Sequence, residues 1–156
     1  LKVSKIEKVE QHPGGAFLYI LTLNTGDSEP RQIVSSIVPF YKAEELLGKN
    51  IVLVYNLKPA NFRGVRSNGM LLAASDPAVT DKETCEVIFA PQFEVGTILE
   101  PEGFSAPEEE LCFVKADKFA EMGLHTKSGF VEIDGKKIGA NGKFLTVEVY
   151  KDGKVK

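Results

Sequence analysis

The sequence is poor in the residues that would suggest metal binding, disulfide bonding or membrane insertion. It has no tryptophan, two histidines and two cysteines, and Cys85 and Cys112 lie 27 positions apart without a Cys-x-x-Cys motif. This usage predicts reduced, buried thiols in a cytosolic protein, and no zinc site. The longest apolar runs, residues 51–55 and 70–74, are too short to cross a bilayer, and no basic-then-apolar leader opens the chain. We therefore expect a soluble, cytoplasmic chain with no membrane partner.

Familiar catalytic motifs are also missing from the sequence. Residues 64–69 have the glycine spacing of a phosphate-binding loop, but a methionine and a leucine follow where a lysine and a hydroxyl residue should stand. There is no Gly-x-Ser-x-Gly or His-Glu-x-x-His motif. His12, before a Pro-Gly-Gly turn, and His125 are interpreted as structural hydrogen-bonding residues. An enzyme is the weakest hypothesis, and the sequence predicts no catalytic residue, metal or cofactor.

The formal charge of −3 hides regions of opposite sign. Residues 1–75 carry 9 basic and 6 acidic side chains, residues 76–130 carry 4 and 12, and residues 131–156 carry 6 and 4. Because a whole-chain charge averages over these regions, it identifies no partner. The acidic segment 76–130 is expected to face away from any anionic ligand.

The first ninety residues read as short strands with one small helix. Strands are expected at residues 3–9, 17–23, 31–36, 50–55, 69–75 and 85–89, with a helix at 43–47 and a loop at 57–68. The crossover helices of a parallel sheet are absent. This order predicts a mainly β fold, an oligonucleotide/oligosaccharide-binding (OB) barrel with a short helix over residues 1–90.

Residues 91–156 are expected to form a β-rich C-terminal extension packed against this barrel. Asp134-Gly135 and Asn141-Gly142 are turn pairs, and strands are expected around them at residues 130–133, 136–138 and 144–150, after a helix at 115–122. The extension is too short and irregular to be an independent domain.

Residues 56–70 differ from the rest of the chain in composition. This segment holds three cations, three asparagines, a serine and a phenylalanine in fifteen positions without a carboxylate, although 22 of the 156 residues are acidic. Unopposed cations attract phosphate, Asn and Ser offer donors and acceptors to bases and ribose, and Phe offers a stacking face. Composition alone leaves a single-stranded nucleic-acid surface and a basic loop without a ligand as open alternatives. If the segment joins two barrel strands, its cations lie at the rim of an open barrel face, which favours the nucleic-acid surface.

This same segment resembles the signature of a known family. Asn56-Leu57-Lys58-Pro59-Ala60, Arg63-Gly64 and residues 69–75 are similar to the tRNA-binding domain shared by endothelial monocyte-activating polypeptide, bacterial tRNA-binding proteins and the C-terminal appendices of methionyl-, tyrosyl- and some lysyl-tRNA synthetases. The similarity continues upstream through His12-Pro13 and downstream through Leu124-His125-Thr126. Since the chain begins with Leu rather than Met, it is expected to be a piece of a longer polypeptide, such as a synthetase.

The resemblance implies a non-catalytic barrel that binds tRNA largely through shape and backbone and raises the tRNA affinity of a synthetase. Relatives often have a basic residue where Asn61 stands, a contact for which Arg66 could compensate, and an acidic residue where Gly14 stands. The tRNA-binding residues expected from composition and resemblance together are Asn56, Lys58, Asn61, Phe62, Arg63, Arg66, Ser67, Met70 and Ser75. The side chain of Met70 is expected to lie in the core.

Two further expectations come from the family. Shorter members pair as homodimers, whereas residues 91–156 resemble the extra piece that occupies the equivalent surface in longer members, so a monomer with an internal pseudo-dimer interface is expected.

A cytokine-like signalling or protein-interaction module, acting as a released and secreted fragment, is the alternative function. Its segment would lie at the start of the barrel, at Val3, Ser4, Lys5, Ile6 and Lys8.

Overall fold

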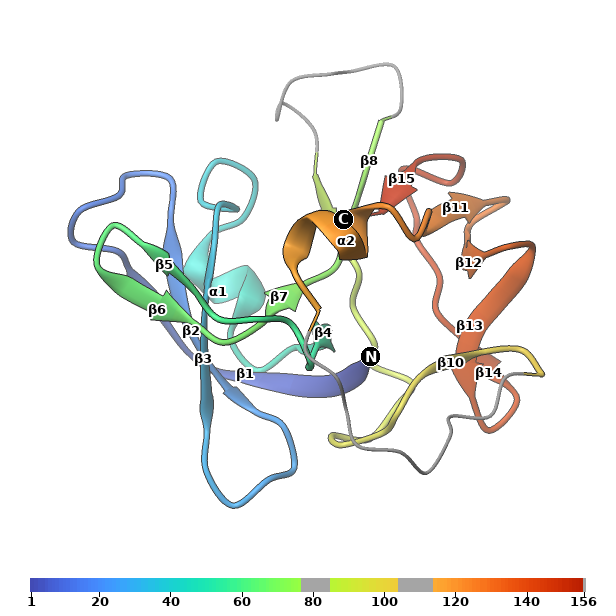
Figure 1. Ribbon diagram of the computed structural model, residues 1–156, viewed down its shortest axis with the longest axis horizontal. Coiled ribbons are helices and arrows are strands. Elements are labelled where there is room, and N and C mark those ends of the chain that lie inside the picture. The colour runs from blue at the N-terminus through green and yellow to red at the C-terminus, as the bar shows by residue number, and fades with distance from the viewer. Residues whose placement is uncertain (77–84, 104–113, 156) are drawn as a thin grey trace.

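The structure, a computed structural model, describes residues 1–76, 85–103 and 114–155 (Figure 1). The elements before the second undescribed segment are β1 (Lys2–Gln11), β2 (Tyr19–Asn24), β3 (Arg31–Ser35), α1 (Ala43–Leu46), β4 (Asn50–Val54), β5 (Ala60–Phe62), β6 (Val65–Ser67), β7 (Met70–Leu71), β8 (Ala73–Ser75), β9 (Glu86–Val87) and β10 (Glu100–Pro101). The later elements are α2 (Ala116–Ala120), β11 (His125–Lys127), β12 (Phe130–Ile133), β13 (Lys136–Ala140), β14 (Lys143–Phe144) and β15 (Lys154–Val155). The chain is thus mainly β, as predicted.

The first half forms a curled antiparallel sheet in the order β3-β2-β1-β4-β7. The long strand β1 pairs with β4 through its first part and with β2 through its second part, and a register shift lies between Ile6 and Lys8. A bulge of this kind bends a strand and increases its twist, which curls the sheet. The outer strands β3 and β7 consequently contact each other. This is the predicted OB-like barrel.

Strand β4 explains how the barrel and the extension share a core. Its residues Ile51, Val52, Leu53 and Val54 are all buried, although successive side chains of a strand point to opposite faces. Ile51 and Leu53 belong to the cluster inside the barrel, and Val52 and Val54 belong to a second cluster on the outer face. The uninterrupted apolar run therefore reflects a strand covered on both sides.

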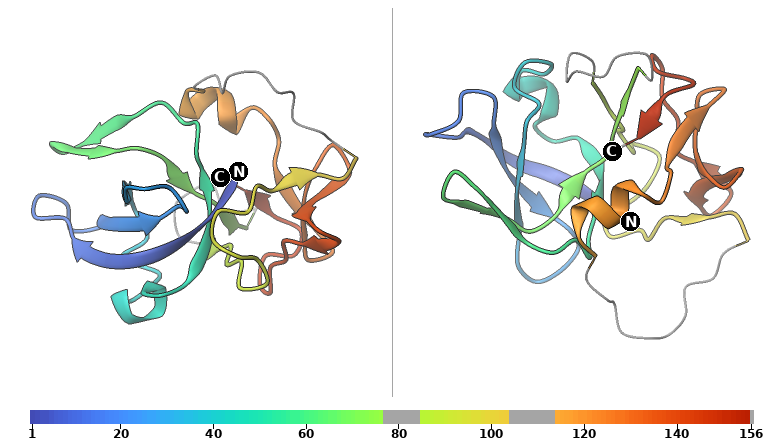
Figure 2. Two further views of the ribbon diagram at one scale, coloured as in Figure 1. Left: turned by 90° about the horizontal axis from the view of Figure 1, so that it is seen from below. Right: turned by 45° about the horizontal axis from the view of Figure 1, so that its top comes forward.

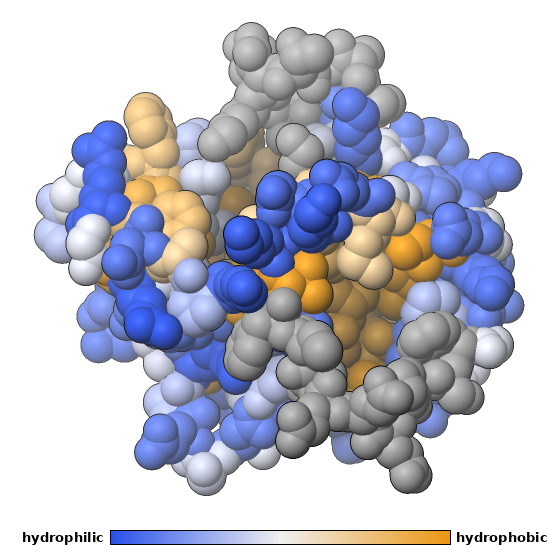
Figure 3. All heavy atoms as spheres, in the orientation of Figure 1, coloured by the Kyte–Doolittle hydropathy of each residue, from blue (hydrophilic) through white to orange (hydrophobic). Residues whose placement is uncertain are grey.

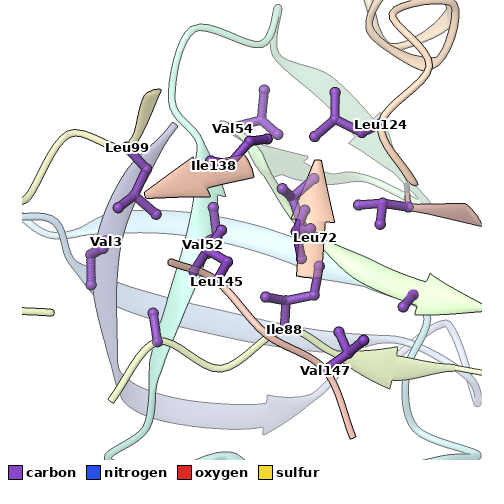
Figure 4. Close-up of a cluster of buried hydrophobic side chains, with 14 of the residues drawn as sticks. Val3, Val52, Val54, Leu72, Ile88, Leu99, Leu124, Ile138, Leu145 and Val147 are labelled. Atoms are coloured by element: carbon purple, nitrogen blue, oxygen red, sulfur yellow. The ribbon is translucent and has the colours of Figure 1, made fainter. Parts of the chain in front are cut away.

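Side chains from the extension cover that outer face. Ile138, Leu145 and Val147 pack with Val52 and Leu72 of the barrel in one buried cluster (Figure 4). The backbone continues the connection, because β8 pairs with β15, which pairs with β11. The predicted packing of a β-rich extension against the barrel is confirmed, and the views in Figure 2 place the two chain ends near each other in the middle of the molecule.

The structure differs most from the predicted elements at three places. The expected loop at residues 57–68 contains the hairpin β5-β6, and the expected strand at 69–75 is divided at Leu72 into β7 and β8. Leu72 donates its N–H to Val52 and packs in the outer cluster, so the chain changes partner strand at this residue. The expected strand at 144–150 ends at Phe144.

The strand expected at residues 144–150 ends early because a carboxylate, and not a partner strand, accepts the backbone N–H groups of residues 148–150. The Glu86 carboxylate accepts the backbone N–H groups of Glu148 at 2.8 Å, Val149 at 2.9 Å and Tyr150 at 3.0 Å. Three consecutive N–H groups converging on one side chain require a turned backbone. Glu86, in β9, therefore fixes the end of the extension to the barrel.

Replacing Glu86 should destabilise the fold. Glu86→Gln retains one acceptor oxygen and is expected to lower the free energy of unfolding by about 1 to 2 kcal/mol. Glu86→Ala removes all three hydrogen bonds and is expected to lower it by about 2 to 3 kcal/mol. Hydrogen bonds to charged groups contribute about 1.5 to 3 kcal/mol each, and these bonds contribute less because they are partly exposed to water. Urea unfolding measures the difference. Glu148→Gln, a change at an exposed neighbouring carboxylate, is the control, and equal effects at both positions would contradict the role of Glu86.

Candidate nucleic-acid interface

The basic segment is displayed on the hairpin β5-β6. Its strands pair Ala60 with Ser67, Asn61 with Arg66 and Phe62 with Val65. The two turn residues are left-handed, with φ of 49° at Arg63 and 86° at Gly64. Two residues of positive φ define the type I′ turn, whose twist matches that of the paired strands. Arg63 therefore stands at the tip of a regular hairpin, not in an irregular loop.

Side-chain hydrogen bonds fasten the hairpin to the edge strand β3. The Ser67 hydroxyl accepts the N–H of Val34 at 2.9 Å and donates to the carbonyl of Gly69 at 3.0 Å. The Gln32 amide donates to the carbonyl of Arg66 at 2.9 Å, and the Asn68 N–H donates to the carbonyl of Gln32. Ser67 is only 3% exposed. Its side chain thus holds the hairpin in place and is not presented to a ligand.

A second set of contacts joins the hairpin tip to the loop between β1 and β2. The His12 ring accepts the Gly14 N–H at Nδ1, at 2.9 Å, and its Nε2 lies 2.8 Å from the carbonyl of Phe62. Because Nδ1 accepts, Nε2 must carry the proton and donate. Arg63 completes the link by donating to the carbonyl of Gly14 at 2.8 Å. His12 therefore does more than cap its own turn, since it fixes a hairpin fifty residues away.

The exposed polar and aromatic side chains on this hairpin and its entry are Lys58, Asn61, Phe62, Arg63 and Arg66, which we call the hairpin surface. Phe62 is 40% exposed. Arg66 donates from Nε to the Asn68 side chain at 3.2 Å, which leaves its terminal nitrogens for another acceptor. Blue hydrophilic atoms surround paler apolar ones at this end of the molecule (Figure 3). The fold thus collects five of the nine predicted site residues.

The other predicted site residues lie elsewhere or point inward. Met70 is half-buried against the outer core cluster, in agreement with the core position expected for its side chain. Ser75 pairs with Lys154 of β15, at the junction of barrel and extension. Asn56 is half-buried, and its carbonyl accepts the N–H of Val114. These three residues therefore do not belong to the hairpin surface.

A polar network that the sequence did not indicate lies beside the hairpin. The Asp27 carboxylate accepts hydrogen bonds from Tyr55 and Thr25, each at 2.9 Å, and from Lys2 at 3.1 Å. The Tyr55 ring lies beneath two cations, with Arg31 at 3.9 Å and Lys2 at 4.6 Å from its centroid. The hydrogen bonds from Tyr55, Thr25 and Lys2 lower the pKa of Asp27 to about 2.

The network borders an open groove of about 670 Å³ between the loop before β3 and the hairpin. Its walls combine Asp27 and Glu29 on one side with Arg66 and Asn68 on the other. Arg31 lines the groove beside the two carboxylates, so side chains of both charges border it.

The Asp27 network predicts a pH-dependent contribution to stability. The carboxyl is ionised down to about pH 2 in the folded chain, but only above about pH 4 when unfolded. Its contribution is therefore complete above pH 4 and is lost as the pH falls from 4 to 2. Thermal melting should show Asp27→Asn less stable than the wild type at pH 7 and the two converging near pH 2. Asp134→Asn, at an exposed turn, should show no such convergence; a constant Asp27→Asn deficit across this range would contradict the assignment.

The proposed signalling segment forms the first part of β1. Val3, Ser4 and Ile6 have no exposed surface, and Val3 and Ile6 belong to the two core clusters. Lys5 and Lys8 are exposed, and Lys8 forms an ion pair with Glu10 at 2.8 Å. Only two of the five residues are thus accessible.

The remaining titratable candidates are held in structural contacts. His125 lies 3.0 Å from the carbonyl of Gly123 and 3.1 Å from the Glu132 carboxylate. Burial, followed by the charge of Glu86, raises the pKa of the Cys85 thiol to about 11, so it is protonated at neutral pH. Cys112 lies outside the described residues.

No helix in residues 1–76, 85–103 and 114–155 is long and apolar enough to cross a membrane. The same part of the chain holds no group of three or more His, Cys, Asp or Glu side chains suited to a metal ion.

Comparisons with known proteins identify relatives of the whole chain. The chain is 39% identical over 163 aligned residues to a methionine–tRNA ligase of Treponema denticola and 37% identical over 164 to that of Borrelia hermsii. These alignments cover 98% and 99% of the chain but 21% and 22% of the enzymes. The chain therefore corresponds to about a fifth of the length of these relatives.

A solved structure shares the complete fold. The C-terminal domain of Plasmodium vivax p43 superposes with a TM-score of 0.86 at 26% identity, over 99% of this chain and 94% of that one. A family model described as a putative tRNA binding domain matches residues 1–98, which include all nine predicted site residues. The chain belongs to this tRNA-binding domain family, and it is a non-catalytic binding domain related to a part of methionyl-tRNA synthetases.

Proposed function

We propose that the chain binds tRNA through the hairpin surface and raises the tRNA affinity of an attached synthetase catalytic core. The observation that carries this proposal is the fixed, carboxylate-free hairpin, with Lys58, Arg63 and Arg66 exposed together. Phosphate contacts of this kind position an RNA without reading its sequence. Methionyl-tRNA synthetase is the favoured parent, since the relatives described above are methionine–tRNA ligases, and the cytoplasm is then the favoured location.

Low sequence specificity is the property that tests this proposal. Fluorescence anisotropy with labelled tRNAs of different amino-acid identity should give similar dissociation constants, because backbone contacts are common to all of them. A duplex DNA of similar length serves as the comparison for shape. Strong preference for one tRNA, or binding that favours the DNA, would contradict recognition through tRNA shape and backbone.

We infer further that residues 1–90 are the tRNA-binding barrel and residues 91–156 an extension that acts as an internal pseudo-dimer interface. The support is the outer face of β4 together with Leu72, between β7 and β8, where extension side chains bury Val52, Val54 and Leu72.

The covered face predicts a monomer in solution. Since the extension already buries the apolar face that a second barrel would need, no such surface is left for self-association at this place. Static light scattering at micromolar concentration should give the mass of one chain. A dimer mass that persists on dilution through this range would contradict the internal interface.

A further inference from the structure

Phe17 is an exposed aromatic side chain that neither the core nor the hairpin surface uses. The sequence placed it in a strand beginning at residue 17, but β2 begins at Tyr19, and Phe17 lies in the preceding loop. Its side chain is 68% exposed. One exposed apolar residue is ordinary on a protein surface. Two further features of Phe17 indicate that it binds a ligand: the ordered loop that carries it and the hairpin beside that loop.

The loop that carries Phe17 is held on both sides of this residue. The Gln11 side chain donates to the carbonyl of Ala16 at 3.0 Å, and the Leu18 N–H donates to the carbonyl of Gly15 at 3.1 Å. The His12 N–H in turn donates to the carbonyl of Leu18. These bonds fix the backbone around Phe17. The ring is therefore presented from an ordered loop, which reduces the entropy lost when it binds a partner.

The same loop lies against the hairpin tip. The bonds from His12 to the carbonyl of Phe62 and from Arg63 to the carbonyl of Gly14 connect the two segments directly. Both views in Figure 2 show the tip of the hairpin beside the loop at one end of the molecule. Phe17 and Phe62 thus belong to two adjoining segments whose relative position is fixed.

The two sequence segments that carry the rings hold no negatively charged side chain. Residues 11–26 contain no carboxylate, and neither do residues 56–75. Arg63 and Arg66 are exposed on the same hairpin as Phe62. Exposed aromatic faces beside unopposed cations are the combination found on platforms for single-stranded nucleic acid, where bases stack and phosphates are neutralised. A protein partner with an apolar surface would not require the absence of carboxylates.

We propose that Phe17, together with Phe62, stacks on unpaired bases of the bound tRNA, so that the surface engages a single-stranded part of the molecule. This inference rests on the proposed function. The phosphate contacts of the proposed function depend on charge. The contact proposed for Phe17 depends on base stacking and is additional to them. The two contributions respond differently to salt, because only phosphate contacts release counterions.

The test compares full-length variants on three probes: tRNA, a short single-stranded RNA carrying 2-aminopurine, and the same RNA in a duplex. Phe17→Ala and Phe17→Leu should weaken binding of tRNA and of the single strand by about 5- to 150-fold, the range expected for loss of one stacked base. The salt dependence should stay unchanged, and 2-aminopurine quenching should decrease. Phe17→Tyr retains an aromatic face and should bind like the wild type. Val149→Ala, at a 67% exposed apolar residue of the extension, is the matched control.

Each outcome of this test is decisive. A Phe17→Leu variant that binds and quenches like the wild type, or an equal loss on the duplex, overturns stacking. Salt-dependent tRNA binding that Phe17→Ala leaves unchanged overturns the role of Phe17 while the proposed function stands. A wild-type chain that does not bind tRNA overturns both. Because Phe17 is exposed, melting temperatures should be unchanged and unfolding cannot account for a loss.

Discussion

Replacing Lys58 and Arg63 by alanine should lower the affinity for tRNA roughly a hundredfold at 50 mM salt. Each phosphate contact contributes a slope of about −0.7 to −0.9 to the dependence of log K on log salt, so loss of two contacts reduces the slope by about 1.4 to 1.8. The wild-type and variant lines then meet near 1 M salt and separate as salt decreases. Anisotropy titrations with labelled tRNA at several salt concentrations measure both the affinity and the slope.

The matched control removes the same charge from the other end of the molecule. Lys127 and Lys136 are exposed lysines of the extension, which lies opposite the hairpin surface in Figure 1. Lys127→Ala/Lys136→Ala should change the affinity much less, because the Debye length is about 10 Å at 0.1 M salt. Equal losses in the two double variants would show that tRNA responds to net charge and not to the hairpin surface.

The second large effect is expected in the shared core. Leu145 is fully buried in the outer cluster, where extension and barrel residues pack together. Leu145→Ala should lower the free energy of unfolding by about 2 to 5 kcal/mol, since it removes buried methyl groups and leaves a cavity. Because the cluster spans both parts of the chain, the variant should still unfold in one transition. Urea unfolding followed by circular dichroism measures both properties.

The exposed neighbour of Leu145 provides the control for that measurement. Thr146→Ala should change the stability by no more than about 0.5 kcal/mol, as is usual for surface substitutions. Two separate transitions in the Leu145→Ala variant, of which only one is shifted, would contradict a common core. Truncation of the extension would be expected to expose Val52, Val54 and Leu72 and to promote association of the barrel.

The succession of strands along the chain and the burial of β4 were predictable, because both depend on the local pattern of apolar and polar side chains. The apolar run at residues 51–55 predicted a buried strand over residues 50–55, and β4 is buried on both faces at residues 51–54. The covering partner of its outer face could not be predicted, because Leu145 and its neighbours lie about ninety residues further along the chain. Periodicity describes a strand and says nothing about which distant segment packs on it.

The hairpin shows where a local pattern was insufficient. Pro59 and Gly64 suggested a loop, yet Pro59 precedes β5 and Gly64 occupies the turn, where its positive φ of 86° is favourable. Both breakers are thus compatible with a hairpin. At residues 144–150 the reverse occurred: the pattern suggested a strand, but the Glu86 carboxylate holds the backbone in a turn. Side-chain bonds of this kind leave no periodic signal.

The sequence predicted which residues gather at the site, but not which of them are exposed to a ligand and which support the hairpin. Lys58, Arg63 and Arg66 are exposed on one hairpin, as the unopposed charges suggested. Ser67 belongs to the same sequence signature, but its hydroxyl is buried in bonds to the backbone of Val34 and Gly69. A sequence signature therefore combines residues that contact a ligand with residues that build the frame, and only burial distinguishes them.

The salt dependence of tRNA binding by the unmodified chain tests the central claim most directly. One phosphate contact for each of the three cations of the hairpin surface predicts that the association constant decreases roughly 20- to 40-fold between 50 and 200 mM salt. Titration of labelled tRNA across this range gives the slope without any substitution. A steep linear decrease in log K against log salt supports recognition through the phosphate backbone, whereas a flat response, or no binding at 50 mM salt, contradicts it.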